Sequence, residues 1–224
     1  MDNILNEIEY VFNENRNVDI AAGQKAYMKN RSEFFGIKSP ERRELQKPFL
    51  AKNSLPLKKD LEQLVKSLWD KPQREFQYFA MELLFKYKKQ FEEKDIELFE
   101  FMVVNKSWWD SIDFISPSLM GEYFKMYPGN RNEYVEKWLA SGNIWLQRSA
   151  VLFQLKYKDG LDNELLTMII EKLQGSREFF INKAIGWILR EYGKVNSHWV
   201  VEFCDKTELA PLSRKEALRI IIKK

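Results

Sequence analysis

The sequence predicts an all-α protein built as a stack of helix pairs, and three observations lead to this fold class. Apolar residues recur three and four positions apart rather than two, which is the period of an amphipathic helix. Only nine glycines and seven prolines occur in 224 residues, and no alternating strand pattern with a hairpin turn is found. Similar segments also recur at a spacing of about 34 residues, as in helical solenoids.

Individual helices can be placed from their apolar stripes and from the prolines that flank them. The clearest stripes are Ile4, Leu5, Ile8, Val11 and Phe12; Leu57, Leu61, Leu64, Val65 and Leu68; and Leu161, Leu165, Leu166, Ile169 and Ile170. The pairs at 39–40 and 116–117 are both Ser-Pro, the pattern of an N-cap followed by the first helical residue. Pro72 and Pro128 are expected to end the helices before them.

The repeat is defined by an alanine that recurs in equivalent helices. Residues 73–87, 143–157 and 178–192 resemble one another and carry this alanine at positions 80, 150 and 184, with a further match at 217. The gaps are 70, 34 and 33 residues, so one unit of the series is missing and would centre on Ile115. A small residue there lets neighbouring helices approach, and the stack presents a concave face. The alternative is a general helical bundle with accidental similarity.

Composition excludes several classes of protein. With 45% hydrophobic and 31% charged residues, the chain can build a core and is not disordered. A single cysteine, Cys204, and a single histidine, His198, exclude a disulfide scaffold, a zinc finger and an HExxH metalloprotease. No metal or cofactor motif is found. Without a leader or a long apolar run, we expect a cytoplasmic protein with a single domain over residues 1–224.

Basic residues recur at equivalent positions of the repeat. The positions two before and six after the alanine are Tyr78, Arg148, Asn182 and Lys215, then Lys86, Lys156, Arg190 and Lys223. Such a ladder, in a chain of net charge +3, suggests a phosphate backbone as the ligand. The alternative is a set of solvated helix faces with ion pairs, for example Glu191 beside Arg190.

The stretch at 105–117 occupies the repeat unit that matches poorly. Its Trp109 and Asp113 are four residues apart, so both lie on one helical face. Trp187 stands three residues before Arg190. Indole faces attract cations, and a carboxylate stabilises a developing positive charge. The alternative is that both tryptophans belong to the core and that Asp113 caps a helix.

Four segments of the chain carry a resemblance to a known family. They are SWWDSID at 107–113, WLQRSA at 145–150, KAIGWILREY at 183–192 and YMKNRSEFFGI at 27–37. With them, the chain resembles the AlkD-type DNA alkylation repair glycosylases over essentially its full length. The resemblance implies a right-handed α-α superhelix of HEAT-like repeats with a concave basic groove. It also implies the excision of N7-methylguanine and N3-methyladenine from duplex DNA without a base-flipping pocket.

The same resemblance implies roles for particular residues. Asp113 is expected to be the catalytic carboxylate, with Trp109 and Trp187 beside the lesion. The DNA backbone would be held by Arg148 and Arg190. Tyr27 would line the cleft, and Lys38 stands at a cleft position where an uncharged amide is expected in relatives. Lys156 of the basic ladder is also expected to contact DNA. The resemblance implies action on alkylated double-stranded DNA near the bacterial nucleoid. We expect a monomer, because a solenoid can cap its own ends, and no cofactor or metal, because the reaction needs none and the sequence holds no motif for one.

The chemistry of the substrate agrees with this set of residues. An alkylated purine already carries a positive charge and is a good leaving group, so a single carboxylate suffices where ordinary glycosidases use two. Two other classes of function stay open from the residues. One is a non-catalytic protein that recognises DNA structure through the same groove, and the other is a solenoid that binds peptides.

Overall fold

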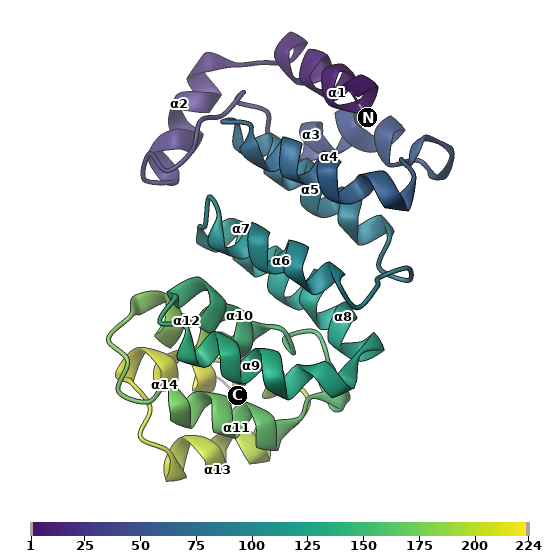
Figure 1. Ribbon diagram of the computed structural model, residues 1–224. Helices are drawn as coiled ribbons and strands as arrows, with labels where there is room; N and C mark the ends of the chain where they lie inside the picture. Colours follow the sequence, from purple (N-terminus) through teal and green to yellow (C-terminus); the bar gives the residue numbers. More distant parts are fainter. Residues whose placement is uncertain (1, 223–224) are drawn as a thin grey trace. The chain divides into compact units, whose positions relative to one another are not determined.

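The computed structural model describes residues 2–222, and within them the chain is helical (Figure 1). Helix accounts for 72% of the structure, and the described residues form no strand beyond one isolated bridge between Glu33 and Gln73. The all-α prediction is therefore confirmed. The chain divides into two compact units, residues 1–91 and 92–224. The prediction of one domain over 1–224 stays a prediction.

The first unit is built around helices α1–α5. Their bounds are α1 (Asp2–Glu14), α2 (Val18–Tyr27), α3 (Ser39–Gln46), α4 (Leu61–Asp70) and α5 (Arg74–Lys86). Helix α1 packs on α3 and α4, and α4 packs on α5. Phe12, Phe35 and Phe76 meet at the centre with ring centroids 5.4–5.8 Å apart. Tilted and edge-to-face contacts of this kind stabilise a core beyond the area that they bury.

The loop between α2 and α3 is held in place by a buried carboxylate. Glu75 is fully buried and accepts the backbone N–H groups of Phe35, Gly36 and Ile37 at 3.1–3.3 Å. Burial raises the pKa of Glu75, and these hydrogen bonds oppose that rise. Gly36 has a φ of +91°, a conformation that favours glycine.

The second unit is a series of helix pairs. They are α6 (Asp95–Val104) with α7 (Trp109–Phe114) and α8 (Gly121–Met126); α9 (Arg131–Ala140) with α10 (Ile144–Leu152); α11 (Asn163–Lys172) with α12 (Phe179–Tyr192); and α13 (Ser197–Lys206) with α14 (Pro211–Leu218). Helix α10 packs against α7 and α12, and α12 packs against α14. These neighbours form the stacked row of an α-α superhelical repeat.

The predicted alanine positions lie at the centres of the repeat helices. Ala80, Ala150, Ala184 and Ala217 belong to α5, α10, α12 and α14 and are all fully buried. Ile115 is also fully buried and lies between α7 and α8. The missing repeat unit is therefore present where the spacing placed it, with a large apolar residue instead of alanine.

One predicted helix start is wrong. Ser116 and Pro117 do not begin a helix but lie inside η4 (Ile115–Met120), a π-helical turn between α7 and α8. The Gly121 N–H donates to the Ser116 carbonyl five residues earlier, and this wider turn accommodates the missing N–H of proline. The Ser116 hydroxyl is buried and bonds the Ile112 carbonyl and the Ser149 hydroxyl of α10.

The other proline expectations agree more closely with the structure. Pro40 is in the first turn of α3, whose cap is Lys38 rather than Ser39. Pro72 and Pro128 each follow the end of a helix. Within the described residues, no helix is both long enough and apolar enough to cross a membrane.

Substitution of Gly36 tests the loop that Glu75 holds. A Cβ at Gly36 would lie 1.9 Å from the Asn17 carbonyl oxygen, which belongs to the backbone and cannot yield as a side chain can. We expect Gly36→Ala to lower the free energy of unfolding by about 1–3 kcal/mol in urea denaturation.

Gly23→Ala is the matched control. Gly23 lies inside α2, and its added Cβ would meet nothing within 4 Å, so we expect a gain of about 0.5–1 kcal/mol because alanine favours helix. Equal effects of the two substitutions would contradict the proposed role of the Gly36 backbone.

Candidate functional site

Asp113 and Arg148 form the centre of the candidate site. Arg148 Nε and Nη2 donate to Asp113 Oδ1 at 2.9 and 2.7 Å. Asp113 lies within α7 and does not cap it, so the helix-cap alternative is wrong. Its other oxygen, Oδ2, accepts no hydrogen bond from the residues that the structure describes. Because the Asp113 side chain keeps 22% of its surface exposed, this oxygen is available to a ligand.

The Arg148 guanidinium connects three helices. It extends from α10, bonds Asp113 on α7 and donates through Nη1 to the Phe180 carbonyl on α12. The Arg148 side chain is only 3% exposed. A bonded arginine buried to this degree is fixed in orientation, so it is better placed to position Asp113 than to reach a phosphate in solvent.

Burial sets the electrostatics of the carboxylate. It raises the pKa of Asp113, and the charge and hydrogen bonds of Arg148 oppose the rise. The nearby negative charge of Asp110 also raises this pKa. The partly buried position strengthens the interaction of Asp113 with any positive charge brought against it.

Aromatic side chains gather where three neighbouring helices begin. Trp108 precedes α7, Trp145 is in the first turn of α10, and Phe180 is in the first turn of α12. Their ring centroids are 4.9–5.7 Å apart. The individual residues were visible in the sequence, but this cluster was not predicted. A signal existed, since aromatic residues open successive repeat helices.

The two predicted tryptophans are neither fully buried nor fully exposed. Trp109 is the first residue of α7, and Trp187 lies within α12. Both side chains therefore retain surface, unlike Trp69 and Trp138 of the core, which are fully buried. Partial exposure distinguishes Trp109 and Trp187 from these two core tryptophans.

The predicted basic ladder is extensively bonded within the protein. Arg190 pairs with Glu216 of α14, and Lys156 donates to the Ser118 hydroxyl at 2.8 Å. Arg190 is thus in an ion pair, as the alternative expected, but its partner is Glu216 rather than Glu191. Glu191 pairs with Lys194 instead. Lys86 and Lys215 are exposed. Lys223 lies outside the described residues.

Tyr27 and Lys38 belong to the first unit. Tyr27 is the last residue of α2 and is 69% exposed, and Lys38 is the exposed residue before α3. Lys38 directly follows Ile37, the last loop residue that Glu75 holds, so its backbone position depends on that buried carboxylate. The other predicted site residues all belong to the second unit.

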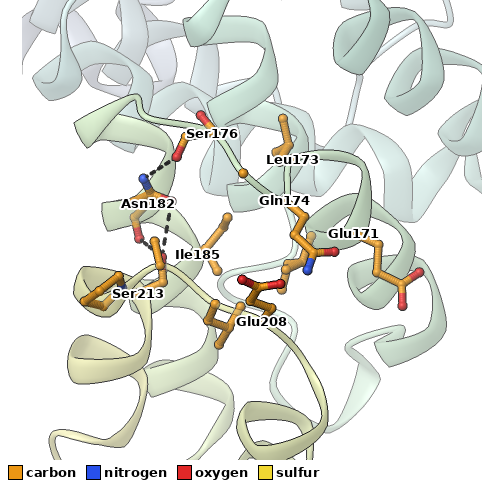
Figure 2. Close-up of a pocket in the computed structure, with 13 residues that line it drawn as sticks. Glu171, Leu173, Gln174, Ser176, Asn182, Ile185, Glu208 and Ser213 are labelled. Carbon is orange, nitrogen blue, oxygen red and sulfur yellow. Dashed lines mark hydrogen bonds between the residues drawn. The ribbon is translucent and has the colours of Figure 1, made fainter.

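A cavity of about 630 Å³ opens elsewhere in the second unit (Figure 2). It is bounded by the segment from α11 to α12 and by the segment from α13 to α14, and its wall includes Glu171 and Glu208. None of the predicted site residues lines it. The chemistry expected of Asp113 is therefore not connected with this cavity.

A family model for the DNA alkylation repair enzymes matches residues 8–221. The chain belongs to this family. A solved structure described as a predicted DNA alkylation repair enzyme from Enterococcus faecalis is similar, with a TM-score of 0.86 and 32% identity. The match covers 93% of this chain and 98% of that one. No curated protein matches significantly.

Membership of the DNA alkylation repair family gives the Asp113–Arg148 pair its context. The family indicates an enzyme of DNA repair and implies DNA binding. A partly buried carboxylate with one open oxygen can stabilise a positive charge placed against it. Alkylated bases such as those considered above carry that charge.

Removal of Arg148 tests the electrostatics of the pair. We expect Arg148→Met to raise the pKa of Asp113 above its value in the unsubstituted protein, because burial then acts without the opposing cation. Carboxyl ¹³C chemical shifts followed against pH measure this directly. Lys137→Met, which removes a cation paired with Glu100 instead, should leave Asp113 unchanged. An unaltered titration in Arg148→Met would contradict the coupling.

Proposed function

We propose that this protein is a DNA glycosylase that hydrolyses the N-glycosidic bond of positively charged alkylated purines, N7-methylguanine and N3-methyladenine, in duplex DNA. The observation that carries the proposal is the Asp113 carboxylate, with one oxygen held by Arg148 and the other open to a ligand. The family match and the similarity to the enterococcal structure support a repair role.

The proposed reaction needs one carboxylate and no second acid. The glycosidic bond breaks with its electron pair passing to the base, which leaves as a neutral molecule because it was cationic at the start. Positive charge then develops on the sugar, and Asp113 stabilises it at close range in a site of reduced dielectric constant. Water adds to the sugar C1′ and releases a proton, which completes the hydrolysis.

Arg148 supports this chemistry as a positioning residue. Its two bonds to Oδ1 fix the carboxylate, and its bond to the Phe180 carbonyl fixes the guanidinium in turn. The site is thus organised before the substrate arrives, which is how fixed charges stabilise a transition state without reorganisation. Trp109 and Trp187 present partly exposed indoles that favour the same cationic state.

We propose that the DNA is held by the basic and aromatic side chains outside this pair. Arg190 and Lys156 supply cations from the second unit, and Tyr27 and Lys38 are exposed on the first. In this proposal the protein acts as a monomer, and the lesion does not enter a base-flipping pocket.

Neutralisation of Asp113 tests the proposed role directly. We expect Asp113→Asn to lower the release of 7-methylguanine from methylated duplex DNA by about 100-fold or more, the scale of losing one electrostatic stabiliser. Binding to undamaged duplex DNA should change little, because the charge acts at the reacting sugar.

Asp110→Asn is the matched control. It removes the same charge from the same helix, three residues away, and should retain most of the base release. If neither the unsubstituted protein nor any variant released the base while DNA binding persisted, the protein would be a binder of damaged DNA. Equal loss of binding and release in Asp113→Asn would make the Asp113–Arg148 pair structural.

The raised pKa of Asp113 predicts a pH dependence. The carboxylate is the active form, so enzyme-dependent release should fall as the pH is lowered through this pKa, at a higher pH than an ordinary aspartate would give. Initial rates should be measured after subtraction of acid depurination without protein. A rate unchanged down to the ordinary range of aspartate would contradict the assignment.

A further inference from the structure

Helix α14 lies unusually close to α12, and a glycine makes the approach feasible. A Cβ at Gly186 would lie 2.5 Å from the Glu216 Cβ and 2.9 Å from the Ser213 carbonyl oxygen. The Ser213 hydroxyl donates to the Asn182 carbonyl at 2.8 Å, and Asn182 in turn bonds the Ser176 carbonyl (Figure 2). These contacts hold Glu216 directly against the middle of α12.

Glu216 gathers three cations from its position between the helices. Its Oε1 accepts from Lys183 Nζ at 2.8 Å. Its Oε2 accepts from Arg190 and lies 3.4 Å from Arg219 Nη1. The carboxylate is only 11% exposed, whereas Lys183 and Arg219 keep 39% and 50% of their side-chain surface. The hydrogen bond from Lys183 and the charges of the two arginines lower the pKa of Glu216.

The geometry differs from that of an ordinary surface ion pair. Lys183 and Arg190 are seven residues apart on α12, which is about 10.5 Å along a helix, and one carboxylate holds both by its two oxygens. Three positive charges around one negative charge leave a net charge of +2. The buried carboxylate keeps the cations close together, with Lys183 and Arg219 partly exposed and Arg190 only 14% exposed beside them. Adjacent, fixed cations of this kind suit a phosphodiester.

We propose that Lys183, Arg190 and Arg219 form one phosphate-binding cluster for the DNA backbone and that Glu216 is its positioning residue. This proposal rests on the DNA-binding part of the proposed function. It gives Arg190 a defined geometry and adds Lys183 and Arg219 to the residues proposed to contact DNA. It also gives a negatively charged residue a favourable role in binding a polyanion.

The direction in which one substitution changes the affinity for DNA distinguishes a positioning role of Glu216 from a purely electrostatic effect. Glu216→Gln removes a negative charge from the protein, so long-range electrostatics alone predicts tighter DNA binding. If Glu216 positions the cluster, the same substitution releases three mutually repelling cations and weakens binding. We expect Glu216→Gln to raise the Kd for duplex DNA by about threefold or more and to reduce the salt slope by about one phosphate contact.

The measurement is fluorescence polarisation of a labelled, undamaged duplex titrated with the full chain at several salt concentrations. Glu171→Gln makes the same change of charge at an exposed residue of α11 and should leave the Kd unchanged or lower it slightly. Binding by Glu216→Gln that is as tight as, or tighter than, binding by Glu171→Gln overturns the proposal. A salt slope equal to that of the unsubstituted protein also overturns the proposal. It would mean that no phosphate contact had been lost, since a loss of packing weakens binding without changing the slope.

A second variant keeps the test decisive if Glu216→Gln does not fold. Arg219→Gln alters a half-exposed member of the cluster and should weaken binding with a salt slope lower by about one. Arg177→Gln removes the same charge from an exposed position before α12 and should have a smaller effect. If Arg219→Gln and Arg177→Gln change the Kd and the salt slope equally, the proposal of a phosphate-binding cluster is overturned. Failure of the unsubstituted protein to bind duplex DNA would instead contradict the proposed function itself.

Discussion

The Arg148 guanidinium is the interaction on which the arrangement of the second unit depends. From α10 it bonds Asp113 on one neighbouring helix and the Phe180 carbonyl on the other. A buried guanidinium is costly unless its donors are satisfied, so the three helices must keep the register that satisfies it. The same requirement fixes the carboxylate that we assign to catalysis. Stability and the geometry of the site are therefore set by one group.

Carboxylates with little exposure organise this protein in three different ways. Glu75 carries no described ion pair and holds three backbone N–H groups of a loop. Asp113 is held by one arginine and keeps an oxygen open, whereas Glu216 is surrounded by three cations. The direction of the pKa follows the surroundings, raised where burial dominates and lowered where cations do. Of these three, the carboxylate with an open oxygen is the one suited to act on a substrate.

The limits of local pattern are clearest at the segment that bears Asp113. The spacing of the alanines located the missing unit at Ile115, because helices that stack must repeat their small and large residues in register. The Ser-Pro pair next to it predicted a helix start and was wrong. The segment instead continues as a π-helical turn, and Ser116 there bonds Ser149 of α10. Tertiary packing overrode the local signal, as is common near functional sites.

The sequence by itself determined the all-α class and the repeat, and it supplied the candidates Asp113, Trp109, Trp187, Arg148 and Arg190. These features could be found because the spacing of apolar, small and charged residues is visible directly along the chain. Only the tertiary structure decided what those side chains do to one another. In the structure, Arg148 is the buried partner of Asp113 rather than an exposed groove residue, and Arg190 is paired with Glu216. The side chains of Trp108, Trp145 and Phe180 also meet there. The physical reason is that hydrogen bonds and ion pairs are made between helices about 30 residues apart. Their formation depends on distances of a few ångströms that no local pattern encodes.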